Sequence, residues 1–182
     1  FQLSGVDGLA YTSYVSGGEV RKEVTTVSGL WHLVGQTVVI LADGAVLPSA
    51  VVSALGEVTL SVKSTVVQVG LGYTSDGQLP RLDAGSANGT SIGKTRRTHR
   101  VGFMLHRTLG LKIGTDFDDL DEVTFRTSSD AMSRAPALFS GVLSETLQSD
   151  YDFENQICWR QDTPLPGLIL AIAPQMVTQD RQ

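Results

Sequence analysis

The amino-acid sequence predicts an all-β protein. Apolar and polar residues alternate along most of the 182 residues, and β-branched residues are enriched in these runs. Glycine, serine or aspartate separates one run from the next at regular intervals, which is typical of sandwiches and barrels. No stretch has the apolar spacing of a helix over more than two turns. We therefore expect a small β-barrel-like module followed by a β-sandwich.

Strands are expected where apolar residues recur at every second position, because strand side chains alternate between the two faces of a sheet. In the longest of them, residues 98–108, the alternation places Val101, Phe103 and Leu105 on one face. The opposite face then carries Arg100, Gly102, Met104 and His106. The expected strands are residues 9–15, 21–27, 36–42, 50–53, 57–62, 65–71, 98–108, 111–114, 123–127, 141–148, 156–161 and 168–173.

Three local signals refine this pattern. The Asp43-Gly44 pair lies between two apolar runs and predicts a two-residue hairpin turn, since both residues tolerate positive φ. Trp31 follows a Ser-Gly turn, and we expect its ring to be buried against Val39, Leu41 and Val69. Residues 117–121 are expected to form one helical turn, with Asp116 or Asp118 as its cap.

Residues 74–94 are rich in glycine and have few apolar residues. They contain Gly77, Pro80, Gly85, Gly89 and Gly93. Such composition is typical of a linker or loop. We therefore expect two domains, a β-barrel-like module at residues 1–75 and a β-sandwich at 76–182, with this glycine-rich loop leading into the second.

The composition is that of an ordinary globular protein, with 41% hydrophobic and 18% charged residues and a net charge of −5. The longest uncharged apolar stretch, residues 165–177, contains two prolines and a glycine, so no membrane-spanning segment is expected. A single cysteine, Cys158, allows neither an internal disulfide nor a thiolate metal cluster. The chain begins at Phe1 without a signal-peptide pattern, and we expect it to be a fragment of a longer protein.

Two short motifs that resemble catalytic signatures lack the residues that their chemistry needs. Residues 89–93 match the G-x-S-x-G pattern around Ser91, but His99 and His106 both precede the downstream acids, which is the wrong order for that fold. Gly93-Lys94-Thr95 resembles the end of a phosphate loop, yet Asn88 stands at the required glycine. We therefore expect no catalytic residue, no cofactor and no enzymatic activity.

Two blocks of opposite charge follow one another in the sequence. The acidic block lacks the spacing of an EF-hand, because Leu120 and Asp121 stand where an oxygen ligand and a glycine are required, although Ca²⁺ binding there stays an alternative. The basic block could neutralise phosphates without reading bases. The interpretation that we prefer is a contact between subunits or between adjoining loops. The candidate subunit contacts are Lys94, Arg96, Arg97 and Arg100 in the basic block and Asp116, Asp118, Asp119 and Asp121 in the acidic block.

Several motifs occur in the order in which they are found in a family of phage proteins. They are SGLWHL at 28–33, VILADG at 39–44, VGLGYT at 69–74, KTRRTHRV at 94–101 and QDTPLP at 161–166. With them, residues 8–180 resemble the C-terminal part of the tail nozzle or tail tubular proteins of short-tailed bacteriophages.

The resemblance implies a structural, non-catalytic ring in the virion tail, assembled in the host cytoplasm, through which DNA is ejected. It also implies a homo-oligomer with other tail proteins as partners, DNA passing through the lumen without sequence reading, and a longer part of the protein upstream. The alternative function is a ligand-binding β-module of a tail fibre, which would recognise a host surface or a carbohydrate. An enzyme acting on cell-wall polymers is a third reading, and it would need paired carboxylates or a metal site in one cleft.

Overall fold

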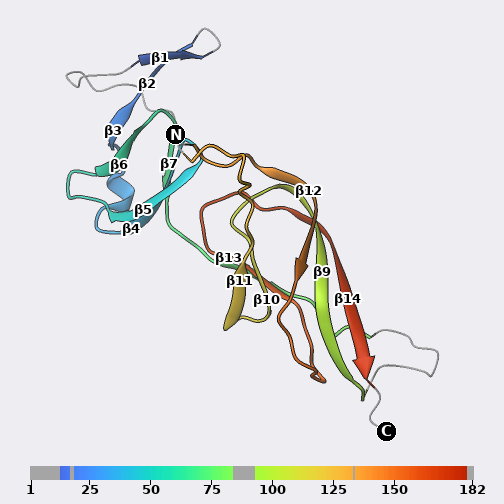
Figure 1. Cartoon of the computed structure of the whole chain (residues 1–182). Coiled ribbons are helices and arrows are strands. Elements are labelled where there is room, and N and C mark those ends of the chain that lie inside the picture. Colours follow the sequence, from blue (N-terminus) through green and yellow to red (C-terminus); the bar gives the residue numbers. More distant parts are fainter. Residues whose placement is uncertain (1–12, 17–18, 84–92, 133, 180–182) are drawn as a thin grey trace. The chain divides into compact units, whose positions relative to one another are not determined.

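The protein is all-β, as the sequence predicts. The computed structural model describes residues 13–16, 19–83, 93–132 and 134–179, and in these ranges it contains strands and one short 3-10 turn but no α-helix (Figure 1). None of the helices in the described part of the chain could cross a membrane. The chain divides into two compact units, Phe1–Tyr73 with Ala131–Ala135, and Thr74–Asp130 with Pro136–Gln182. The expected domains differ from these units by two residues at the boundary and by the 131–135 segment.

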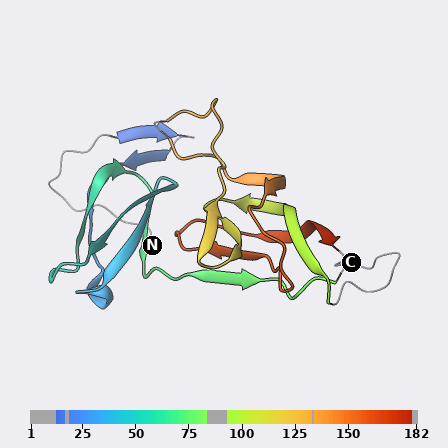
Figure 2. The same ribbon diagram turned by 60° about the horizontal axis from the view of Figure 1, so that its bottom comes forward.

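The first unit contains seven described strands in three antiparallel sheets. The pairs and triplets are β1-β2, β3-β6 and β5-β4-β7, and barrel closure is not seen among the described residues (Figure 2). A core of aliphatic side chains, centred on Val38 and Ile40, lies between the second and third of these sheets. The elements are β1 (Ser13–Ser16), β2 (Glu19–Lys22), β3 (Val24–Val27), the 3-10 turn η1 (Trp31–Leu33), β4 (Thr37–Ala42), β5 (Ala45–Val51), β6 (Val58–Ser64) and β7 (Val67–Gly70).

The predicted hairpin turn at Asp43-Gly44 is confirmed. Asp43 has a φ of 48° and Gly44 a φ of 83°, and the flanking residues Ala42 and Ala45 are paired. The Asp43 carboxylate also accepts hydrogen bonds from the amide and hydroxyl of Thr65, at 3.0 and 2.8 Å, and from the amide of Val66 at 2.8 Å. One side chain therefore joins the β4–β5 turn to the turn between β6 and β7.

The second unit is a sandwich of two antiparallel sheets. We call the sheet β12-β9-β14 the β9 sheet and the sheet β11-β10-β13-β8 the β13 sheet. Side chains from both, including Phe103 of β9 and Ile113 of β10, form one hydrophobic core. The elements are β8 (Ser75–Gln78), β9 (Thr95–Thr108), β10 (Lys112–Asp116), β11 (Asp119–Glu122), β12 (Phe139–Thr146), β13 (Cys158–Gln161) and β14 (Ile169–Gln179).

The long strand β9 alternates as the sequence predicts. Val101, Phe103 and Leu105 are buried, while Met104 and His106 on the other side are exposed. The strand begins three residues earlier than expected, at Thr95, so most of the basic block lies within it. It pairs with β14 along its length, and the two strands run side by side in Figure 1.

Two expectations around the acidic block are wrong. Residues 117–121 form a hairpin turn and the start of β11 rather than a helical turn, and residues 123–127 lie outside any strand. The hairpin is favoured because Gly114 has no Cβ that would overlap the carbonyl oxygen of Asp119, so the two strands can approach. Asp116 does act at the turn, because its carboxylate accepts the amide of Asp118 at 3.3 Å.

Candidate subunit-contact surfaces

The basic block is divided between the interior and the surface. Arg97 and Arg100 are exposed and Lys94 is half-buried, whereas Arg96 has no exposed surface. The guanidinium of Arg96 donates to the carbonyl oxygen of Leu82, and its backbone exchanges two hydrogen bonds of 2.9 Å with Asp152. The prediction that Arg96 is a subunit contact is therefore wrong, because a bulge at His99 shifts the alternation of β9 and turns this side chain inward.

A buried polar cluster surrounds this end of β9. Thr98 is fully buried and its hydroxyl donates to the side-chain oxygen of Asn155 at 2.5 Å. The hydroxyl of Ser149 donates to the carbonyl oxygen of Thr98, also at 2.5 Å. Together with Arg96, these groups attach the chain between β12 and β13 to β9. Their role is structural, since they hold in place the strand that presents Arg97 and Arg100.

The outer face of the β9 sheet includes three cross-strand rows. An apolar row joins Val142, Met104 and Ala171; the side chains of Val142 and Met104 are 67% and 45% exposed. A row of small residues follows, and beyond it a polar row contains Arg100. The small row is Ser144, Gly102 and Ala173, and the polar row is Thr146, Arg100 and Gln175.

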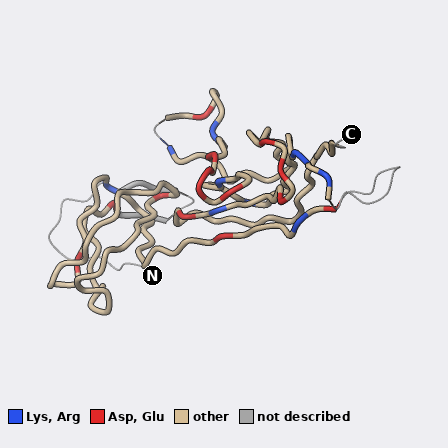
Figure 3. Tube along the Cα trace, turned by 90° about the horizontal axis from the view of Figure 1, so that it is seen from below, with Lys and Arg blue, Asp and Glu red and all other residues tan. Residues whose placement is uncertain are grey.

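Charge is distributed unevenly between the two sheets. The three strands of the β9 sheet contain four arginines and a single carboxylate, Glu145, which is half-buried and paired with the core residue Val101. The four strands of the β13 sheet contain five carboxylates and two basic residues. Figure 3 marks these charged positions along the chain. Arg96 is buried and Asp121 pairs with a core residue, so the β9 sheet keeps three exposed arginines and the β13 sheet four other exposed carboxylates. The sheets pack through a shared core, so these two outer faces point away from each other.

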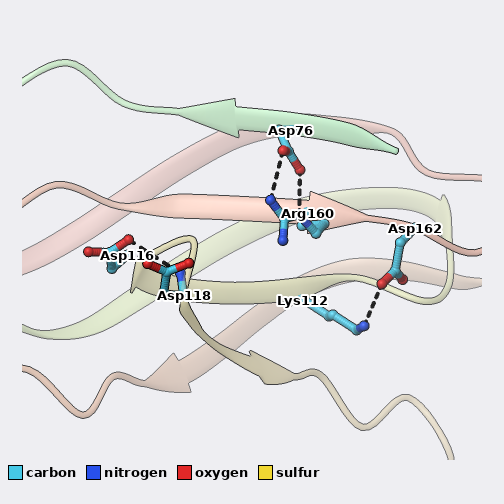
Figure 4. A network of polar contacts seen from close by, with 6 residues as sticks. All are labelled: Asp76, Lys112, Asp116, Asp118, Arg160 and Asp162. Carbon is cyan, nitrogen blue, oxygen red and sulfur yellow. Dashed lines mark hydrogen bonds and ion pairs between the residues drawn. The ribbon is translucent and has the colours of Figure 1, made fainter. Parts of the chain in front are cut away.

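The acidic face has an ordered row of charges that the sequence did not reveal. Glu122, Lys112, Arg160 and Asp76 lie opposite one another on the four successive strands. Arg160 donates from Nε to Oδ1 of Asp76 at 2.7 Å and from Nη2 to Oδ2 at 2.9 Å (Figure 4). Lys112 pairs with Asp162 through a contact of 2.6 Å between Nζ and Oδ2. Both basic side chains of this sheet are thus paired, Arg160 with a carboxylate of β8 and Lys112 with one that follows β13.

Arg160 holds several groups at the centre of this face. Its guanidinium lies 5.3 Å from the centroid of the Phe117 ring, a cation–π contact. The hydrogen bonds from Arg160 lower the pKa of Asp76, and the same pair raises the pKa of Arg160, to which the charge of Asp118 also contributes. Figure 4 shows Asp118 on the same side of the sheet as Arg160.

The carboxylates of the acidic block are exposed, and none of them forms an ion pair with a residue that the structure describes. Glu122 lies in the outer row with Lys112, and Asp118 lies in the outer turn near Arg160. Asp121 pairs with the core residue Ile113, so it belongs to the inward-directed row at the edge of the sheet. Asp119 pairs with Asp116 where the register shifts. The structure therefore brings the two blocks together in one sandwich but on different sheets.

Other candidate chemistry finds no site in the described ranges. No group of three or more histidine, cysteine, aspartate or glutamate side chains there could hold a metal ion. Cys158 is buried, and this burial raises the pKa of its thiol. Of the motif around Ser91, residues 89–92, Ser91 included, lie outside the described residues.

Trp31 does not occupy the core of the first unit, contrary to expectation. Its side chain is 65% exposed, and the ring lies against Gly56, which has a φ of 66°. Leu30 enters the core instead, and its amide donates to the carbonyl oxygen of Gly56 at 3.0 Å. The short 3-10 turn changes the side-chain direction after Leu30, which period-2 reasoning does not anticipate.

Comparison with known proteins adds no assignment. No protein-family model matches the sequence, and no curated protein matches it significantly.

Proposed function

We propose that this chain is a non-catalytic structural component of a bacteriophage tail, of the nozzle or tubular type, and that its copies form a ring. In this role it resides in the virion tail, is assembled in the host cytoplasm, and contacts other tail proteins. DNA passes through the ring without sequence reading. The order of the sequence motifs supports the family, and the all-β fold is compatible with it.

The observation that carries the proposal is the opposite charge of the two outer faces of the second unit. In a ring of identical subunits each contact joins two different surfaces, because a head-to-tail arrangement repeats around the axis. A sandwich with exposed arginines on one sheet and exposed carboxylates on the other presents two such surfaces. Charge complementarity favours correct orientation during association and opposes contacts between like faces.

The shape and oligomeric mass of the full-length protein test this function. Electron microscopy should show closed rings with an axial opening, and light scattering should give an integral multiple of the subunit mass. A full-length protein that remains monomeric at all concentrations, without ring particles, contradicts the proposal. Absence of the protein from purified tails would do so as well.

The exposure of Trp31 favours the second candidate, a ligand-binding module of a tail fibre. An exposed tryptophan ring is a suitable platform for stacking against a sugar or another flat ligand. Titration of the chain with polysaccharide from the host envelope, followed by tryptophan fluorescence, tests it. A saturable change that is lost in Trp31→Ala supports ligand binding, and an unchanged signal excludes Trp31 as the binding residue.

A further inference from the structure

We infer that the contact between neighbouring copies joins the outer face of the β9 sheet of one subunit to the outer face of the β13 sheet of the next. This inference rests on the proposed ring and specifies its interface. The surface of the β9 sheet is its apolar row, its row of small residues and the exposed arginines Arg97 and Arg100. The matching surface is centred on Asp118, Glu122 and Arg160.

The row of small residues allows a close approach. Ser144, Gly102 and Ala173 have short side chains, so this part of the sheet is low between the apolar row and the arginines. At Gly102 an added Cβ would meet only Ala173, at 3.6 and 3.7 Å, which is ordinary van der Waals contact. The position is open on the outer side, and a neighbouring surface can lie directly on it.

The exposed apolar row on this face favours its burial by another protein surface. Val142 and Met104 lie opposite each other with much of their side chains exposed, next to Ala171. Burial of such a row contributes about 25 cal/mol for each Å² of apolar surface removed from water. A protein surface can supply that burial, whereas a phosphate backbone cannot.

The complementary charge of the two faces favours a second copy of the chain as the partner. The exposed arginines need carboxylates opposite them, and the β13 sheet has Asp118 and Glu122 exposed, while its own basic side chains are engaged by Asp76 and Asp162. Because the two faces are on opposite sides of one sandwich, each subunit can bind one neighbour through each face. Such contacts repeat until the ring closes.

DNA is the competing partner for Arg97 and Arg100, and the observations favour protein. The chain has a net charge of −5, and nucleic-acid binding is driven by the release of counterions from neutralised phosphates. The exposed arginines of β9 are Arg97, Arg100 and Arg107, and the strand also carries the exposed apolar residue Met104, which is a poor match to a phosphate backbone.

Complementary charge reversal in two variants tests the contact. One variant carries Arg97→Glu and Arg100→Glu, which makes both faces acidic. The other carries Asp118→Lys and Glu122→Lys, which reduces or reverses the charge of the acidic face. Each variant alone should associate at least about tenfold more weakly than the wild-type chain. An equimolar mixture should regain association, because the two variants can alternate around the assembly. Reversal of the exposed Lys63 in the first unit is the matched control and should have no effect.

A steric variant tests the same surface independently of charge. Gly102→Tyr should fold normally, since its Cβ fits, and should block association by projecting from the outer face. Gly70→Tyr is the control, because Gly70 is also a strand glycine and has nothing within 4 Å of the added Cβ. Circular dichroism confirms that both variants are folded.

Sedimentation of these variants separates the outcomes. The contact is supported if the mixture of the two charge variants regains association and if Gly102→Tyr, but not Gly70→Tyr, loses it. Assembly that is unaffected by all of these changes overturns the inference while leaving the proposed ring intact. A wild-type chain that does not associate overturns the inference, and the shape of the full-length protein then decides the proposed function. Loss of DNA affinity in the arginine variant with unchanged assembly assigns these arginines to phosphate and also overturns it.

Discussion

Arg96 and Arg97 are adjacent in the sequence, yet their side chains lie on opposite sides of β9, one fully buried and the other exposed. Replacing Arg96 should therefore change stability, and replacing Arg97 should not. We expect Arg96→Met to lower the free energy of unfolding by about 2–4 kcal/mol, since the buried hydrogen bond to Leu82 is lost. Arg97→Ala should stay within about 0.5 kcal/mol of the wild-type value. Urea denaturation measures both, and equal effects would contradict the assignment of the two side chains.

The Asp43 carboxylate should contribute to the stability of the first unit through its three hydrogen bonds to Thr65 and Val66. We expect Asp43→Gly to cost about 1–3 kcal/mol, although glycine adopts the positive φ easily. Thr65→Val removes only the hydroxyl bond and should cost less. Thermal or urea unfolding that ranks the two variants in the opposite order would show that the turn conformation, rather than the carboxylate, is decisive.

Replacing Leu30 by alanine should destabilise the protein more than replacing Trp31, although tryptophan is the larger residue. Leu30 is buried in the core, so Leu30→Ala should cost about 2–5 kcal/mol. Trp31→Ala should lower the melting temperature much less, because most of the ring is already in water. A large loss of stability in Trp31→Ala, comparable to that of Leu30→Ala, would mean that the ring is packed in solution.

The ion pair between Arg160 and Asp76 should be visible in the titration of Asp76. Its pKa lies below the ordinary value of 3.8, because Arg160 donates hydrogen bonds to the charged carboxylate. A carboxyl whose pKa is lower in the folded state stabilises the protein above its unfolded pKa, and this contribution is lost as the pH falls through the folded pKa. Carbon-detected NMR should place the midpoint below 3.8 and return it toward that value in Arg160→Gln. A midpoint unchanged by the substitution would exclude the ion pair.

Local patterns in the sequence predicted the features that depend on neighbouring residues. The alternation of Val101, Phe103 and Leu105 predicted the inner face of β9, because one face of the strand must be buried. The Asp43-Gly44 pair predicted the turn between β4 and β5, because positive φ restricts the choice of residues there. The ring, the tail and the absence of catalysis stay predictions that await measurement.

Features that depend on strand register could not be read in this way. The pairing of Arg160 with Asp76 joins residues from β13 and β8, and Lys112 reaches Asp162 from a third strand. Nothing local to these residues indicates which strands become neighbours. The burial of Arg96 was missed for a related reason: a bulge at His99 shifts the alternation, so the phase of Val101 does not extend simply to the start of the strand.

Salt dependence of self-association is the most direct measurement of the central claim, that copies of the chain join through oppositely charged faces. Exposed charges are screened strongly as ionic strength rises, with a Debye length of about 10 Å at 0.1 M and about 3 Å at 1 M. Sedimentation velocity of the wild-type chain should show assemblies at about 50 mM salt that dissociate as the salt approaches about 1 M. A single monomeric species at low salt, or assemblies whose proportion does not change with salt, would contradict it.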